Sequence, residues 1–192
     1  MRWGVSAGLG WHLPQSAFTI GAEGRIGYQI SNMFGAYAVI GGTGGFGIGG
    51  NITTSGASVS ITAISYWYFG GIAELMLGNL FYVGGGPVLA NGALAGVGTS
   101  AGTGGASVTT VVAAGWKPGL DLRLGLGFGK PRAGSFRRGG FNLGVDALVL
   151  FHPDAIVGRV QANSDGSAGV EVKTTELAVT VTPMLTFGYD AR

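Results

Sequence analysis

The sequence lacks cysteine altogether, so neither disulfides nor thiolate metal sites can stabilise its fold. It is also poor in charge, because charged residues make up 10% of the 192 residues, against roughly 25% in an ordinary soluble domain. Between Arg25 and Lys117 the only formal charge is Glu74. A water-soluble globule of this size would struggle to cover its surface, so an apolar surround is predicted.

No stretch of the chain has the composition of a membrane-spanning helix. The best candidate, residues 75–98, contains seven glycines, Pro87 and two asparagines. Each glycine costs roughly 1 kcal/mol of helix propensity relative to alanine. A bilayer can otherwise be crossed only by a closed barrel of shorter strands, so the sequence favours that alternative.

Signals for targeting and for nucleic-acid binding are also missing. The start, "MRWGVSAGLGW", has no uninterrupted apolar segment of a secretory signal, so we expect an exported protein in a mature form, without its signal peptide. The net charge of +2 is too small to predict a nucleic-acid partner, and no basic helix or stacking platform is visible. We expect no cofactor and no metal site.

Glycine, by contrast, is abundant, with 40 residues. The stretch "GGTGGFGIGG", residues 41–50, contains a literal G-x-G-x-x-G after an apolar run. A dinucleotide-binding loop would have to lead into a helix, with an acid some twenty residues later. Residues rich in β-branched and aromatic side chains follow instead, and the first acid is Glu74. Two interpretations are left: a strand whose inner face is stripped of side chains, or a flexible linker.

The first twelve residues alternate with a strict period of two, which predicts a strand. One face carries Trp3, Val5, Ala7, Leu9 and Trp11, and the other carries Arg2, Gly4, Ser6, Gly8, Gly10 and His12. Eight residues at about 3.3 Å each, tilted by about 40°, place the two tryptophans roughly 20 Å apart along a membrane normal. That spacing is typical of the aromatic girdles of an outer-membrane barrel.

Four later segments share this alternation, with large apolar residues on one side and Gly, Thr or charge on the other. They are residues 18–30, 120–128, 141–152 and 177–189. The middle of the chain is harder to divide, and we place strands at 36–50, 59–77 and 80–93. Residues 107–116 are either loop or an additional strand segment.

Together these segments predict one domain, residues 1–192, with an all-β fold: a transmembrane antiparallel up-and-down β-barrel of eight strands, or alternatively ten. With the N-terminus on the periplasmic side, three short turns fall at one end, at 31–35, 78–79 and 130–139. Four outer loops fall at the other, at 13–17, 49–60, 94–118 and 153–175. In this pattern the chain resembles the small bacterial outer-membrane β-barrels, the OmpA-like and OmpX-like group. The resemblance implies a Gram-negative outer membrane and an outer-membrane assembly machinery. That family usually ends on an aromatic residue, whereas here three residues follow Tyr189.

Several charged residues fall on the inward face of the predicted barrel. A charge in so narrow a lumen must be paired. We therefore predict a plugged lumen holding a network of Glu23, Arg25, Glu74, Asp121, Arg123 and Asp146. The alternative is a narrow, porin-like pore that favours cations, because four carboxylates face two arginines.

A second candidate site lies at the outer rim, where His12 ends the first strand, His152 ends the seventh and Glu176 opens the eighth. The eighth strand of a closed barrel lies between the first and the seventh, so the carboxylate would lie between two imidazoles. Such a trio could bind a divalent metal or serve as acid/base groups of an outer-leaflet lipid-modifying enzyme, although no partnered nucleophile is evident. The other interpretation is three solvated residues.

Two surface features complete the predicted membrane protein. An aromatic girdle is expected from Trp3, Trp11, Phe128, Phe141, Phe151 and Tyr189. The only basic run forms a turn, solvated or in contact with lipopolysaccharide phosphates, of Lys130, Arg132, Arg137 and Arg138. The expected partners are thus the bilayer and lipopolysaccharide, with a structural, adhesive or small-pore role. A soluble ligand-binding barrel is a further alternative, but it requires a polar outside and an apolar lumen.

Overall fold

A computed structural model of the chain describes residues 1–13, 15–78, 80–102, 105–131, 138–152, 155–163, 167–175 and 179–191. Every regular element in these ranges is a β-strand. The strands are β1 (Arg2–His12), β2 (Ala17–Gln29), β3 (Phe34–Thr53), β4 (Gly56–Leu77), β5 (Phe81–Gly102), β6 (Gly105–Gly127), the two-residue β7 (Lys130–Pro131), β8 (Arg138–Phe151), β9 (Ala155–Asn163), β10 (Ala168–Thr175) and β11 (Val179–Ala191). The described residues include no helix long and apolar enough to span a bilayer.

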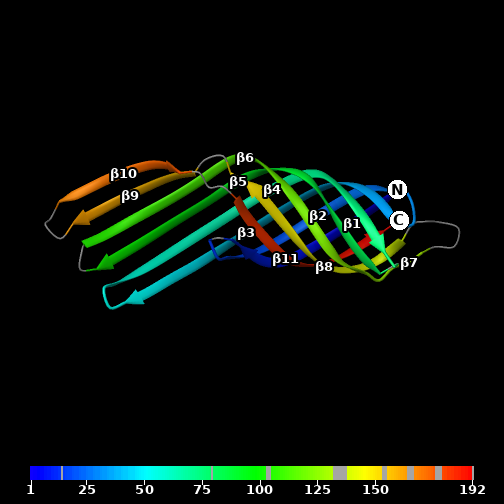
Figure 1. Cartoon of the computed structure of the whole chain (residues 1–192), viewed down its shortest axis with the longest axis horizontal. Coiled ribbons are helices and arrows are strands. Elements are labelled where there is room, and N and C mark those ends of the chain that lie inside the picture. The colour runs from blue at the N-terminus through cyan, green and yellow to red at the C-terminus, as the bar shows by residue number, and fades with distance from the viewer. Residues whose placement is uncertain are drawn as a thin grey trace.

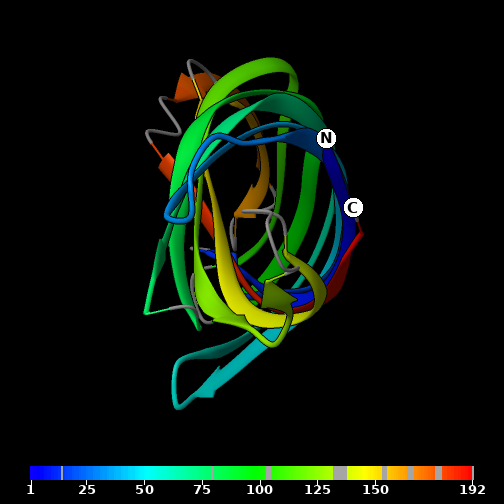
Figure 2. The same cartoon turned by 90° about the vertical axis from the view of Figure 1, so that its right-hand side faces the viewer.

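Eight strands hydrogen-bond in a closed ring. The order is β1-β2-β3-β4-β5-β6-β8-β11, and β11 pairs with β1 to complete it. All pairings are antiparallel and follow the chain up and down, so the ring is barrel-like (Figures 1 and 2). The predicted all-β antiparallel barrel with an eight-stranded ring is confirmed.

Apart from the two-residue β7, the described residues form two strands outside the ring, β9 and β10, which makes ten. The predicted number of eight therefore describes the ring, and the alternative of ten describes the sheet as a whole. The C-terminal part of β6, from Gly119 to Gly127, pairs with β8. Its N-terminal part, from Gly105 to Val112, pairs with β9. β10 then pairs with β9. Beyond the ring, the ends of β3 to β6 and the β9–β10 hairpin form one open sheet, which we call the extension. It projects from the end of the ring opposite both chain termini (Figure 1).

The predicted outer loops at 49–60, 94–118 and 153–175 are therefore wrong in most of their length. β3 and β4 continue to a two-residue turn at Thr54 and Ser55, and β5 and β6 continue to Gly102 and from Gly105. The many glycine, serine and threonine residues of these segments predict loops, but their side chains still alternate between the two faces of a sheet. Pairing with neighbouring strands satisfies their backbone groups, which outweighs their low intrinsic strand propensity.

The direction of alternate side chains follows the pattern seen in the sequence. In the ring, large apolar side chains point outward, among them Leu9, Ile40 and Leu124, each more than half exposed. Inward positions are buried and carry both the charged residues and a cluster of tyrosine and aliphatic side chains. The core of the molecule is thus the filled lumen of a small barrel.

The glycine-rich stretch 41–50 is part of β3, as the strand interpretation predicted. Its inward positions alternate with Ile40, Phe46 and Ile48, which are outward and exposed. A Cβ atom at the inward Gly41 would collide with the ring of Tyr68, which reaches across from β4. At the outward Gly42, an added Cβ would meet its nearest neighbour at 3.5 Å, an ordinary contact. Gly41 therefore makes room for a large side chain from β4, whereas a Cβ atom at the inward Gly45 would collide with the backbone of β2.

Candidate functional site

One end of the lumen is closed by an ionic network centred on Asp190, near the end of β11. Its carboxylate accepts from Arg2 Nη2 at 2.7 Å and from Arg25 Nε and Nη2, each at 2.9 Å. Arg2 also lies 3.4 Å from Glu74 and donates to the hydroxyl of Tyr37 at 2.7 Å. These side chains come from β1, β2, β3, β4 and β11, so the network crosses the ring.

A second network fills the middle of the lumen around Arg123 of β6. Its Nη2 donates to both carboxylate oxygens of Glu23, at 2.9 and 2.8 Å, and to Asp121 at 2.7 Å. Tyr68 donates to Glu23 at 3.2 Å. Asp146 on β8 is the direct cross-strand neighbour of Arg123 and is buried as well.

The structure therefore buries all six residues of the predicted lumen network inside the ring. Sequence reasoning left out three buried charges: Arg2, Lys117 and Asp190. Arg2 and Asp190 both continue the inward phase of their strands, a signal that was present. With them, five carboxylates face four cations, so the predicted acidic excess shrinks from two to one. Paired charges at these distances fill a lumen only wide enough for side chains.

The histidines lie in a third group, at the end of the ring from which the extension projects. We call this group the rim cluster; it consists of His12, Tyr66, Lys117 and His152. The ring centroid of Tyr66 lies 5.9 Å from that of His12 and 6.2 Å from that of His152. The Lys117 ammonium is 5.3 Å from the Tyr66 ring and donates to two backbone carbonyls. All four residues are buried.

Threonines of β11 occupy the place between the histidines that was predicted for Glu176. His12 Nδ1 lies 2.8 Å from the Thr182 hydroxyl, and His152 Nε2 lies 2.7 Å from that of Thr180. Glu176 itself is outside the described residues. The expected position of β11 between β1 and β8 is correct, but the histidines are buried side chains with hydroxyl partners and not solvated rim residues.

All six residues predicted for the girdle are exposed on the outside, as are Trp67 and Trp116. Tyr189 packs against Phe141 at 5.3 Å near the termini, and Trp11 packs against Phe18 at 5.3 Å at the other end of β1. Of the basic turn, Lys130 and Arg138 lie in β7 and β8 without described side chains, and Arg132 and Arg137 fall outside the described residues.

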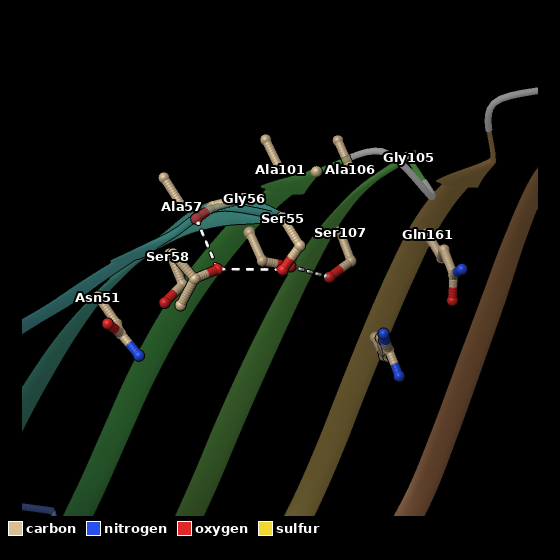
Figure 3. A pocket seen from close by; sticks show the side chains of 14 residues that line it. Asn51, Ser55, Gly56, Ala57, Ser58, Ala101, Gly105, Ala106, Ser107 and Gln161 are labelled. Atoms are coloured by element: carbon tan, nitrogen blue, oxygen red, sulfur yellow. Dashed lines mark hydrogen bonds between the residues drawn. The ribbon is translucent and has the colours of Figure 1, made fainter.

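The extension presents a different surface, which faces inward over the barrel mouth. A row of polar side chains crosses five neighbouring strands in register: Asn51, Ser58, Ser100, Ser107 and Gln161. Figure 3 shows Asn51, Ser107 and Gln161 on one side of the sheet and Ala57, Ala101 and Ala106 on the other. The polar row lines a shallow hollow of about 450 Å³. The sequence predicts loops for most of these segments and leaves residues 107–116 open between loop and strand, so it does not predict this surface; the strand alternative for 107–116 is the correct one.

Among the described residues, no group of three or more histidine, aspartate and glutamate side chains could hold a metal ion. The chain matches no protein-family model, no curated protein and no solved structure.

Proposed function

We propose that this chain is an integral β-barrel protein of a Gram-negative outer membrane, with a plugged lumen and an external sheet that serves a structural or adhesive role. The ring would span the bilayer, and the extension would stand on the cell surface. Lipopolysaccharide and the assembly machinery would be its membrane partners. The pattern of strands supports a likeness to small outer-membrane barrels.

The polarity of the ring carries this proposal. Every charged side chain described in the ring is buried in the lumen, while the outer surface is lined by exposed leucine, isoleucine, valine and aromatic residues. This arrangement is the reverse of a soluble ligand-binding barrel. In water, each outward leucine would cost roughly 25 cal/mol per Å² of exposed apolar surface, whereas acyl chains would cover it. Aromatic residues at both ends of β1, and near the C-terminal end of β11, suit the two membrane interfaces.

The closed ring supports membrane insertion on separate grounds. Within hydrocarbon every backbone donor and acceptor must be satisfied by the protein. The eight paired strands satisfy that requirement, whereas the extension has free edges and belongs in water. The termini and the short turns would then face the periplasm.

The ionic networks favour a plug over a pore. Arg123 bridges Glu23 and Asp121, and Arg2 and Arg25 both bind Asp190, so the charges that would line a cation pathway neutralise one another. Their shortest distances, 2.7 to 2.9 Å, are those of charge-assisted hydrogen bonds. A hydrated ion could pass only after these pairs separate.

Refolding into detergent or vesicles tests the proposal. A closed barrel should run at a different position on a gel with and without boiling. After insertion into vesicles, the bilayer should protect the strands of the ring from an added protease. Planar-bilayer recording then separates plug from pore: we expect no steady conductance. A protein that stays soluble and ignores vesicles would overturn the membrane assignment, and a steady cation current would overturn the plug.

A further inference from the structure

Three contiguous hollows run along the inner face of the extension, from the barrel mouth to the hairpin tips. The hollow at the mouth has a volume of about 300 Å³, and the next two have about 360 and 450 Å³. Ser60, Gly98 and Thr109 line both the first and the second hollow. The second and third hollows share four of the five residues of the polar row, those from Asn51 to Ser107. The hollows therefore form one trough.

The lining of this trough changes from apolar to hydrogen-bonding along its length. On β6, the inward residues from mouth to tip are Val111, Thr109 and Ser107, and on β9 they are Val157, Arg159 and Gln161. On β4 the order is Ile64, Thr62, Ser60 and Ser58. Leu94 of β5 lines the hollow at the mouth and is buried. β4, β6 and β9 thus share one gradient, and Leu94 of β5, the strand between β4 and β6, extends its apolar end.

The gradient belongs to the inner face alone. The outward residues of the same strand segments are mainly apolar, such as Ile48, Val108 and Val160, with Thr99 and Thr110 among them. Leu94 is buried where it lines the hollow at the mouth, and Val111 packs against the core to which Leu94 belongs. Val111 and Val157 are only half-buried, and the surface that they still present to the hollow gains free energy when something apolar covers it.

Charge enters the lining at one described residue, Arg159, which lines the hollow near the tip. No ionisable residue lines the hollow at the mouth, and the polar row carries hydroxyl and amide groups only. Arg159 lies opposite Glu171 of β10 in the strand register. Lys173 donates to Glu171 at 2.5 Å, and this hydrogen bond lowers the pKa of the Glu171 carboxyl. The positive charge of Arg159 also lowers the pKa of that carboxyl, so Glu171 partly balances the charge of Arg159.

We propose that the trough binds an uncharged amphiphile, with its apolar end against Val111, Val157 and Leu94 and a hydroxylated head along the polar row. The distance suits such a molecule, because four residues separate Val111 from Ser107, which is about 13 Å of strand. The hydroxyl and amide groups of the row can donate and accept, as polyhydroxylated heads require. This site goes beyond the proposed membrane role and rests on it only for the side of the membrane from which the ligand enters.

The absence of native cysteine makes a direct test simple. Val111→Cys places a thiol in the trough, and Val112→Cys, the matched control, places one on the outer face of the same strand. Both variants of the full chain are inserted into vesicles, and the probe is octyl glucoside below its micelle-forming concentration. At about ten times Kd, the probe should slow thiol labelling at position 111 about tenfold and leave position 112 unchanged.

The orientation and the head group have their own controls. Ser100→Cys, at the polar end, should be protected by octyl glucoside but not by octanol. Octyl sulfate and octyltrimethylammonium should protect position 111 far less than octyl glucoside does. Leu94→Trp should fill the apolar end and abolish protection at position 100, with the gel shift on boiling showing that the barrel still folds.

Three outcomes would overturn the proposal: no protection at position 111, equal protection at 111 and 112, or equal protection by the charged amphiphiles. Failure of the membrane assignment is recognised separately, because the protein would then neither insert nor show a heat-dependent mobility.

Discussion

Arg2 and Asp190 lie 188 residues apart in the sequence, and their side chains meet in the lumen at 2.7 Å. They lie on β1 and β11, the two strands whose pairing closes the ring. Asp190 also holds Arg25 with two hydrogen bonds. The first and last strands are thus joined by backbone pairing on the wall and by an ion pair inside it.

Replacing Asp190 by asparagine should destabilise the protein strongly. Arg2 and Arg25 would lose their shared carboxylate while staying buried, and breaking a buried ion pair typically costs about 3 to 5 kcal/mol. Urea unfolding in lipid vesicles measures the change. Lys173→Met is the control, because its partner Glu171 is exposed on the extension, and it should leave the unfolding midpoint unchanged. Equal effects of the two variants would contradict the central role of Asp190.

Two adjacent glycines of β3 should respond in opposite ways to alanine. Gly41→Ala puts a methyl group into the ring of Tyr68, and such overpacking costs about 1 to 3 kcal/mol. Gly42→Ala points outward, where the added methyl group makes only an ordinary contact at 3.5 Å, and it should be neutral or stabilise by about 0.4 to 1 kcal/mol. Both values come from the same urea titration. If both variants were neutral, the inner face of β3 would not be under steric pressure.

Leu124→Arg tests the outward face of β6, where this side chain is 59% exposed. An arginine against lipid near the midplane should cost about 2 to 4 kcal/mol of stability in the membrane. Val172→Arg, on the outer face of the extension, should be tolerated because that strand lies outside the ring. A loss below about half a kcal/mol at position 124 would contradict the assigned lipid contact.

His152→Ala separates a structural rim cluster from a catalytic one. Loss of the hydrogen bond to Thr180 in a buried site should cost about 1 to 3 kcal/mol of stability. The lipid composition of cells carrying the variant should match that of cells with the unchanged protein. A defined lipid product that disappears in the variant while the barrel still folds would support the lipid-modifying enzyme.

The sequence was sufficient for the ring because the inner and outer faces of its wall have opposite polarity on alternate residues. Glu23 and Arg25, two positions apart between exposed isoleucines, are enough to orient β2. The extension could not be predicted in the same way. Its alternation of Ser58, Val59, Ser60 and Ile61 uses small residues that suit loops equally well, and pairing with distant strands decides between the two.

The candidate sites show the same division. Charges inside the ring were predictable one strand at a time, but their partners were not, because Asp190 meets Arg2 only after the barrel closes. Thr180 and Thr182 carry no signal in the sequence that would mark them as histidine partners. The trough depends on the register of five strands, which no single segment encodes.

The central claim is that the outer wall of the ring contacts acyl chains, and the four native tryptophans test it without any substitution. Trp3, Trp11, Trp67 and Trp116 all point outward and are about half exposed. Phospholipids with brominated acyl chains quench tryptophan only on contact. Refolding into such vesicles should quench most of the emission relative to unbrominated vesicles, whereas equal emission in the two would contradict the membrane barrel.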